Sequence, residues 1–496
     1  MRQLSIRFHR VLALIGGMAL LIWASSGLLH PIMTTWGPQQ AVFYPPSEPV
    51  DLTGSVSIPE TIRAAGINDA RAIRVIASDG ENLLQVTEDP IAPRRYFELD
   101  TGSERENYDE AHAIYLARYY TGETGAIRSV EHVTEFSPAY PQVNRLLPVY
   151  KVTFDRADNK SIYIYTETNA VAGMGNSFKN TMQTAFQWLH TWSWFPKEAD
   201  WARVILIGLL LITLFALGVT GVFMLVLIRR KVKAPGVRGW HRIAGYALAL
   251  PILTYSASGF YHLITVASTS PALALRLSDP IDLAATDFDI SDQWAEISSG
   301  LNVSSVSIIR DSNGSSLYRL GIAADRSGGP TSAAEIRNAR FDGVERTGPA
   351  VYLDAMTGEA VQHGDREIAT RMAESFTGIS REQFLQTALV TRFGPEYDFR
   401  NKRLPVWQFD IASPVNGTIF VDTATGVLAD VSPDETKLER LSFSLLHKLN
   451  FLRGFGRHMP NLAASIIMVL LLGFMAILGL QMDLKRRSRR AKKCQE

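Results

Sequence analysis

Four stretches of this sequence are almost purely apolar, and they constrain its fold more than any other feature. They are Val11 to Leu29, Val204 to Ile228, Ile243 to Ile264 and Leu462 to Met482. Each approaches or exceeds the ~20 apolar residues that a helix needs to cross a bilayer. The first follows a basic start, as a signal peptide does, but it carries Trp23 and no small-residue cleavage site. The sequence therefore predicts four membrane-spanning helices, with the first one retained.

Basic residues gather beside three of the membrane borders and predict the orientation. They precede the first span, separate the second from the third, and follow the fourth: Arg2, Arg7, Arg10; Arg229, Arg230, Lys231, Lys233, Arg238; Lys485, Arg486, Arg487, Arg489, Arg490, Lys492, Lys493. By the positive-inside rule, these regions and both termini are cytoplasmic. The segments of roughly 31–201 and 265–460 are then exported, to the periplasm if the membrane is a bacterial inner membrane. The basic clusters border spans, so they do not indicate nucleic-acid binding.

Cysteine use limits the chemistry of the exported segments. The chain has one cysteine, Cys494, in the predicted cytoplasmic tail. The exported segments can therefore form no disulfide, no CxxCH haem attachment and no cysteine-ligated iron–sulfur cluster. Their stability must come from packed cores.

An internal repeat predicts a tandem duplication of a helix–domain–helix unit. Phe8-His9-Arg10 and Ser26-Gly27-Leu28-Leu29-His30 match Trp240-His241-Arg242 and Ser258-Gly259-Phe260-Tyr261-His262 at an offset of 232. Phe186-Gln187-Trp188-Leu189-His190 matches Phe443-Ser444-Leu445-Leu446-His447 at an offset of 257, as Leu147-Pro148-Val149-Tyr150 matches Leu404-Pro405-Val406-Trp407. The second exported segment is thus 25 residues longer. We expect the extra length in loops such as Ser327 to Ser332.

The exported segments have the pattern of α+β domains. Alternating polar and apolar residues predict half-buried strands at Tyr150 to Phe154, Ser161 to Tyr165 and Val406 to Ile411. Helices are predicted at Glu110 to Tyr120 and Arg366 to Phe376, each followed by Thr-Gly as a stop.

This order of helix, strand, turn and strand resembles the PepSY domain, and nearly the whole chain resembles the PepSY-associated transmembrane family. The resemblance rests on the His-Arg openings of spans one and three, the Leu-His before spans two and four, and the paired exported domains. It implies an inner-membrane protein tied to iron uptake, with some members acting as haem-containing ferric-siderophore reductases. The expected fold is a membrane α-helical four-helix bundle with two exported α+β, PepSY-like domains. The expected boundaries are transmembrane helix 1 at 8–33, domain 1 at 34–180, an interfacial segment and helix 2 at 181–230, a cytoplasmic loop at 231–239, helix 3 at 240–266, domain 2 at 267–440, an interfacial segment and helix 4 at 441–483, and a basic tail at 484–496.

Six of the ten histidines occupy matched positions at membrane borders: His9, His30, His190, His241, His262 and His447. A single one of them could be an ordinary interfacial histidine with a wet ring. Six in three matched pairs favour a function, because ionisable groups in spans usually mark one. Imidazoles without carboxylate or thiolate partners favour haem iron held by two histidines within a helix bundle. Zinc would usually require Cys, Asp or Glu ligands, which are few at these borders.

The spacing of these histidines predicts haem near both membrane faces. His9 and His30 are 21 residues apart, roughly 32 Å along a helix, and face roughly one side of it. A parallel repeat makes His9 and His241 the expected cytoplasmic pair. The outer four permit one haem or two, so two haem b groups are expected, and three would use all six ligands.

Other residues allow two readings. Gly27 and Gly259 could leave room for a macrocycle or pack helices closely. Arg10 and Arg242 could pair with haem propionates or anchor the helix ends. Four histidines lack this matched pattern and are expected to be solvated or substrate-facing: His112, His132, His363 and His458. Trp188, Trp192, Trp194 and Trp201 have the pattern of an interfacial aromatic belt.

The hypothesis from the sequence is a membrane haem b oxidoreductase that reduces a ferric siderophore or other ferric chelate on the periplasmic side and releases Fe(II). No nicotinamide or flavin motif occurs in the chain, so quinol or a cytoplasmic reductase would supply the electrons. Two alternatives remain: a non-catalytic PepSY protein that binds or regulates a partner, and a component of a siderophore or metal transporter. The expected partners are membrane lipid, the ferric chelate and the electron donor. The spans contain no Asp or Glu between their borders, which disfavours ion-coupled transport.

Overall fold

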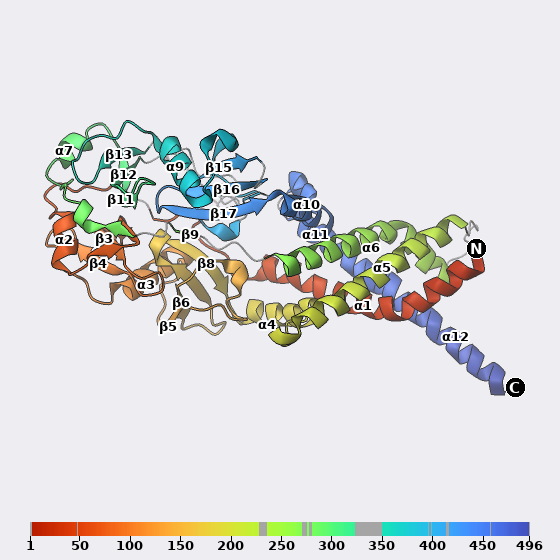
Figure 1. Cartoon of the computed structure of the whole chain (residues 1–496). Helices are drawn as coiled ribbons and strands as arrows, with labels where there is room; N and C mark the ends of the chain where they lie inside the picture. Colours follow the sequence, from red (N-terminus) through yellow and green to blue (C-terminus); the bar gives the residue numbers. More distant parts are fainter. Residues whose placement is uncertain are drawn as a thin grey trace. The chain divides into compact units, whose positions relative to one another are not determined.

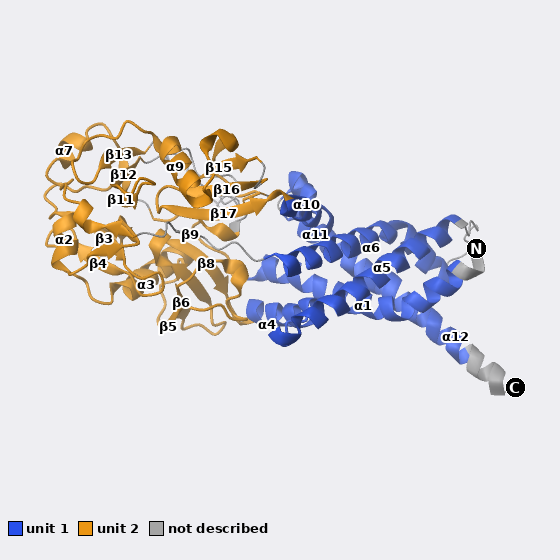
Figure 2. Cartoon of the chain, viewed as in Figure 1, with its two compact units in different colours: residues 1–37, 178–271, 435–496 blue, residues 38–177, 272–434 orange. Residues whose placement is uncertain are grey.

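The structure of this chain is a computed structural model that describes residues 2–46, 48–227, 236–269, 275–276, 280–322, 350–394, 396–397, 399–412, 416–456 and 458–495. The chain forms two compact units (Figure 2). We call residues 1–37, 178–271 and 435–496 the helical unit, and residues 38–177 and 272–434 the sheet unit. Two expectations lie outside the described residues: the inserted loop at 327–332 and the basic residues at 229–233.

The helical unit contains the four predicted spans, and each is confirmed as a helix long and apolar enough to cross a membrane. These helices are labelled in Figure 1. Their bounds are α1 (Arg2–Trp36), α5 (Asp200–Leu227), α6 (Val237–Ser268) and the run formed by α11 (Met459–Leu470), η10 (Leu471–Ile477) and α12 (Leu478–Gln495). Length and composition thus give this chain the character of a membrane-embedded protein.

Small and branched side chains hold these helices together. One buried cluster takes residues from all four: Ala19, Leu20 and Ala24 of α1, Leu214 of α5, Ala244, Leu248 and Ile252 of α6, and Leu471 and Ala476 of η10. Alanine at such positions lets helix backbones approach closely, so dispersion contacts replace the hydrophobic effect that lipid does not supply.

Short helices lead into α5 and α11, and both end in a π-helical turn. The first pair is α4 (Ser177–Phe186) followed by η3 (Gln187–Thr191). The second is α10 (Asp434–Ser442) followed by η8 (Phe443–His447). A π turn widens a helix locally and occurs often at functional sites.

The sheet unit is built around a six-stranded antiparallel sheet that takes strands from both of the segments predicted to be exported. Its order is β13 (Val351–Asp354), β12 (Ser316–Ile322), β11 (Val303–Arg310), β2 (Ala72–Ser78), β3 (Glu81–Thr87), β4 (Arg95–Glu98). The two segments meet where β2 pairs with β11, in a register that sets Val75 opposite Val306 and Ile73 opposite Ile308. The predicted boundaries of two exported domains stay a prediction, and the structure adds that strands from both segments share this central sheet.

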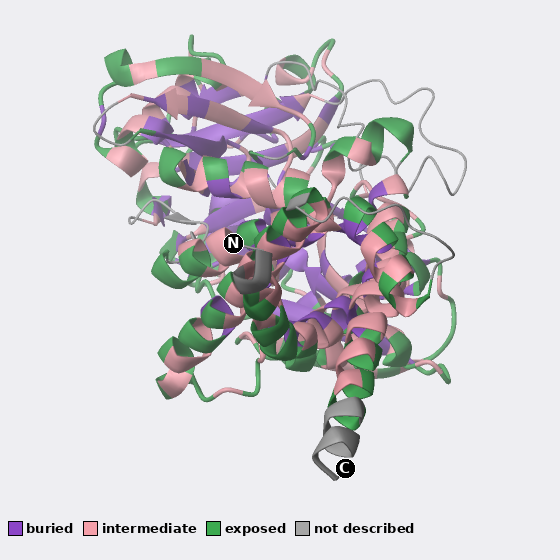
Figure 3. Ribbon diagram, turned by 90° about the vertical axis from the view of Figure 1, so that its right-hand side faces the viewer, coloured by how far each residue is buried: buried purple, intermediate pink, exposed green. Residues whose placement is uncertain are grey.

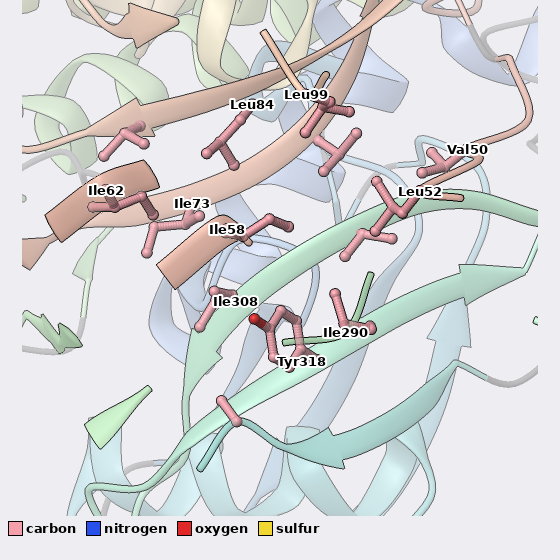
Figure 4. Packing of buried hydrophobic residues seen from close by; sticks show 14 of the residues in the cluster. Val50, Leu52, Ile58, Ile62, Ile73, Leu84, Leu99, Ile290, Ile308 and Tyr318 are labelled. Atoms are coloured by element: carbon pink, nitrogen blue, oxygen red, sulfur yellow. The ribbon is translucent and has the colours of Figure 1, made fainter. Parts of the chain in front are cut away.

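An apolar core covers this central sheet and also draws on both segments. Ile58, Ile73 and Leu84 from the first pack in one cluster with Ile308 and Tyr318 from the second (Figure 4). The smaller elements of the unit are α2 (Ile58–Ala64), α7 (Trp294–Ile297), and the paired short strands β1 (Asp69–Ala70) and β10 (Ile281–Asp282).

Two further antiparallel sheets confirm the predicted α+β character. One has the order β5 (Ile127–Val133), β6 (Val149–Phe154), β7 (Ser161–Tyr165), β8 (Ala170–Gly175) and packs on α3 (Tyr108–Thr121). The other has the order β14 (Phe384–Val390), β15 (Val406–Ile411), β16 (Gly417–Asp422), β17 (Val427–Pro433), β9 (Leu275–Arg276) and packs on α9 (Asp365–Thr377). The three predicted strands and two predicted helices are all present.

One expectation about the strands is wrong in detail, because β7 is buried along its whole length rather than on one face. Ile162 and Ile164 pack on the α3 side, while Tyr163 and Tyr165 pack in a second cluster with Tyr140. Both faces are therefore covered. Buried residues concentrate in the strands, as Figure 3 shows.

Candidate functional site

The helical unit contains all six matched histidines. His9 and His30 belong to α1, and His241 and His262 belong to α6. His190 lies in η3 and His447 in η8, so both π turns carry a histidine. The elements that sequence reasoning linked through the repeat thus carry the same residue in the same kind of local structure.

The structure brings His190 and His447 together. Their ring centroids are 6.5 Å apart and the ring planes are nearly perpendicular, at 83°. Each ring also stacks on the phenylalanine four residues before it in the chain, Phe186 or Phe443, with a centroid distance of 4.6 Å in both cases. The π turns and these phenylalanines therefore hold the two imidazoles next to each other, and we call His190 and His447 the facing pair.

Serine hydroxyls hold the Nδ1 atoms of this pair. Ser26 Oγ lies 3.0 Å from His190 Nδ1, and Ser258 Oγ lies 3.3 Å from His447 Nδ1. Each serine is positioned to donate its single hydrogen to a carbonyl of its own helix, to Trp23 or Thr254. The serine oxygen then accepts from Nδ1–H, and in a neutral imidazole this leaves the Nε2 lone pair for a ligand.

His9 and His241, the predicted cytoplasmic pair, also have a hydrogen-bond acceptor beside Nδ1. His9 Nδ1 is 3.1 Å from Thr220 Oγ1, whose hydrogen goes to the Ala216 carbonyl, and His241 Nδ1 is 3.2 Å from the Phe474 carbonyl oxygen. Their rings lie over glycines: a Cβ at Gly221 would be 3.5 Å from His9 Cε1, and one at Gly479 would be 3.8 Å from His241 Cε1. The two rings contact different helices, so the pairing of His9 with His241 stays a prediction.

His30 and His262 flank the facing pair, each beside one of its phenylalanines. The His30 ring lies 6.0 Å from Phe186, and the His262 ring stacks on Phe443 at 3.9 Å. His262 Nδ1 also lies 2.6 Å from Glu439 Oε1. Six rings thus follow one another in the order His30, Phe186, His190, His447, Phe443, His262.

Sequence reasoning missed the residues that position these histidines. A signal existed for four of them, because Ser26, Ser258, Phe186 and Phe443 all lie inside the repeat matches, and a Phe four residues before a His shares its helix face. No sequence signal singles out Glu439.

The two glycines near the outer histidines have different surroundings. A Cβ at Gly259 would lie 3.6 Å from His447 Cε1, so this glycine lets the imidazole approach α6. A Cβ at Gly27 would lie 3.4 Å from Met468 Sδ, which is a helix-packing contact.

Among the unmatched histidines, the expectation for His112 is wrong. Its ring is fully buried, with Nδ1 2.7 Å from Ser78 Oγ and Nε2 2.8 Å from Asn169 Oδ1. Burial lowers the pKa of His112 to about 4. His132, His363 and His458 are exposed.

The aromatic residues after η3 form a cluster. Trp192, Trp194 and Phe195 lie with ring centroids 4.6 to 6.3 Å apart, and Trp188, Trp194 and Trp201 are exposed. Within the described part of the chain, no group of three or more His, Cys, Asp or Glu side chains is arranged to hold a metal ion by itself.

Comparison with known proteins adds no relative. No protein-family model matches this chain, and no curated protein matches it in sequence.

Proposed function

We propose that this chain is a duplicated inner-membrane protein that binds haem b through its matched histidines and passes electrons to a ferric siderophore or other ferric chelate in the periplasm. The facing pair of His190 and His447 is the observation that carries the proposal. A ring nitrogen lies about 2 Å from a bound metal and about 1 Å from its ring centre, so two rings on opposite sides of one iron have centres about 6 Å apart. The observed 6.5 Å fits that requirement.

The Nδ1 contacts also fit ligation. Five of the six matched histidines have an acceptor on Nδ1: Thr220 for His9, Ser26 for His190, Phe474 for His241, Glu439 for His262 and Ser258 for His447. Metal-ligating histidines almost always donate their other N–H to such a partner, which fixes the tautomer and the ring orientation.

The matched contacts support the proposed duplication. Ser26 and Ser258 are related by the offset of 232, and Phe186 and Phe443 by the offset of 257. Gly221 and Gly479 are related by 258, one residue more, and the π-helical segment Leu471–Ile477 precedes Gly479. A single inserted residue is accommodated in a helix as a π turn.

In this proposal the protein's own residues bind the haem and fix its orientation. Haem, when bound, supplies one-electron chemistry. The histidines hold it at fixed positions, and the serines, Thr220 and the Phe474 carbonyl prevent the rings from turning. Reduction of the chelate adds one electron to Fe(III), and the hard oxygen donors then hold Fe(II) less tightly. The electron comes from quinol or a cytoplasmic reductase.

An absorption spectrum of the purified full-length protein tests the proposal. We expect a Soret band and a dithionite-reducible α band, with His190→Ala and His447→Ala each lowering the haem content. The matched control is His458→Ala, an exposed histidine at the start of α11 that should leave the spectrum unchanged. A protein without a reducible haem spectrum would refute the proposal and leave the binding protein and the transporter.

A further inference from the structure

The π turn that carries His190 ends in four carbonyls, and side chains cap all of them. The last four carbonyls of a helix have no partner within that helix. Here each accepts from a side-chain N–H: Trp194 Nε1 donates to the Trp188 carbonyl at 3.2 Å, Trp192 Nε1 to that of Leu189 at 3.2 Å, Trp23 Nε1 to that of His190 at 3.1 Å, and Arg203 Nη1 to that of Thr191 at 3.0 Å. We call Trp23, Trp192, Trp194 and Arg203 the carbonyl cap.

Helix α1 holds His190 at two points through this cap. Trp23 donates to the backbone carbonyl of His190, and Ser26, one turn further along the same helix face, lies 3.0 Å from its ring Nδ1. Trp192 stacks on Trp23 with a centroid distance of 6.4 Å and ring planes 22° apart, so it supports the indole. Both the backbone and the ring of His190 are therefore fixed to one helix.

The second half of the repeat holds His447 differently. At the offset of 257, the cap positions after η8 carry residues whose side chains have no N–H: Leu449, Phe451 and Pro460. The position matched to Trp23 is Tyr255, whose buried hydroxyl has no hydrogen-bond partner among the described residues. His447 is held through its ring, by Ser258 and Phe443. The two members of the facing pair are thus held unequally.

We infer that the carbonyl cap consists of positioning residues that fix the His190 ring and keep the two imidazole planes of the facing pair crossed when haem is bound. This inference rests on the proposed haem ligation by His190 and His447. Their planes stand at 83° to each other in the structure. Crossed axial imidazoles leave two ferric d orbitals close in energy, whereas parallel imidazoles separate them. Crossing therefore gives a strongly anisotropic low-spin ferric EPR signal instead of a rhombic one.

A cap that only stabilised the end of η3 would act on the backbone alone. Its removal would speed the hydrogen exchange of amides in residues 187–193 but would leave the relation between the ring planes unchanged. A cap that positions the ring changes both. The EPR signal therefore separates the two roles.

EPR spectroscopy of the ferric, haem-loaded, full-length protein tests the inference. The signal of the facing pair is the one that His447→Ala removes, and we expect it to be strongly anisotropic in the unmutated protein. Trp23→Phe keeps an aromatic ring but removes the N–H, and should shift this signal towards the rhombic form. Tyr255→Phe is the matched control: it removes the hydroxyl at the equivalent position of α6 and should leave the signal unchanged.

A second variant covers the case in which Trp23→Phe fails to fold or to bind haem. Trp194→Phe gives the first half the residue type of the matched position 451 and removes a cap bond that does not end on His190 itself. A smaller shift in the same direction is expected.

Three results would overturn the inference and leave the proposed function standing. They are a rhombic facing-pair signal in the unmutated protein, an unchanged signal in Trp23→Phe or in the variant that replaces it, and an equal shift in Tyr255→Phe. Absence of reducible haem from the unmutated protein would instead defeat the proposed function.

Discussion

The atoms contacted by each histidine separate the candidate ligands from a structural histidine. His190 and His447 have Nδ1 held by a serine, and their ring centroids lie 6.5 Å apart. His112 has hydrogen bonds at both nitrogens, to Ser78 and Asn169, and is fully buried. No nitrogen of His112 is left for a metal, so its role is to complete a buried polar network in the sheet unit.

This burial predicts a pH dependence of stability. The pKa of His112 is about 4 in the folded chain, below its ordinary value of 6.5, so the unfolded chain binds the proton more readily. The contribution of the neutral, buried His112 to the free energy of unfolding is fully present above pH 6.5 and is lost as the pH falls towards 4. A difference of this size corresponds to about 3 kcal/mol. Urea unfolding of the sheet unit within the full chain at pH 7.5 and at pH 5, with protease sensitivity as the readout, measures this loss of stability.

The control for this prediction removes the titrating group. At pH 7.5, His112→Gln should be less stable than the unmutated chain, because it loses the buried hydrogen bonds of His112. Its free energy of unfolding should, however, fall less between pH 7.5 and pH 5 than that of the unmutated chain. His132→Gln, at an exposed position, should behave like the unmutated chain. An unchanged pH dependence in His112→Gln would show that other groups cause it.

At the scale of single elements, the ends of α3 and α9 follow from their sequences. Each helix ends at a Thr-Gly pair, and Gly122 and Gly378 adopt φ values of 67° and 66°. The Gly122 amide bonds to the Arg118 carbonyl, and the Gly378 amide to that of Glu374. A residue with a Cβ is strained in this left-handed conformation, which explains why glycine stops both helices.

We expect Gly122→Ala to destabilise the sheet unit by about 1 kcal/mol. The added Cβ would meet only Ala41 Cβ at 3.8 Å, an ordinary contact, so the cost comes from the backbone conformation. Gly125→Ala is the matched control, because its surroundings are open and its φ is not in the left-handed region. Thermal unfolding compares the two, and equal effects would argue against the strained cap.

At the scale of the whole molecule, the two segments predicted to be exported share one sheet and one core, so we expect neither to be stable without the other. Their strands join at the pairing of β2 with β11, and buried ion pairs cross between them. Arg403 Nη2 lies 3.7 Å from Glu167 Oε1, and Arg145 Nη1 lies 3.0 Å from Asp430 Oδ1. Removing one segment would break both of these ion pairs and expose the shared core, although Arg403 would keep Asp422 at 2.9 Å.

This shared core predicts cooperative unfolding of both segments. Ile308→Ala removes a side chain that is 2% exposed in the cluster containing Ile58 and Ile73, and should cost about 3 kcal/mol. Hydrogen exchange should then increase in β2 and β3 as well as in β11 and β12. Ile91→Ala, an exposed isoleucine, is the control. Faster exchange confined to the second segment would show that the segments unfold independently.

The sequence alone determined the elements whose signals are local. Long apolar runs predicted the four helices, alternation predicted β6, β7 and β15, and Thr-Gly predicted the ends of α3 and α9. Each of these depends on neighbours within a few residues along the chain. The repeat also selected six of the ten histidines without any knowledge of their surroundings.

Only the tertiary structure decided which side chains meet. The facing of His190 and His447, the serines on their Nδ1 atoms and the contact of Glu439 with His262 join residues far apart in the sequence. The same holds for the burial of His112 and for the strand pairing that joins the two segments predicted to be exported. A local pattern specifies which face of an element is apolar, but the packing of elements specifies what that face touches, and the chemistry of these histidines depends on what they touch.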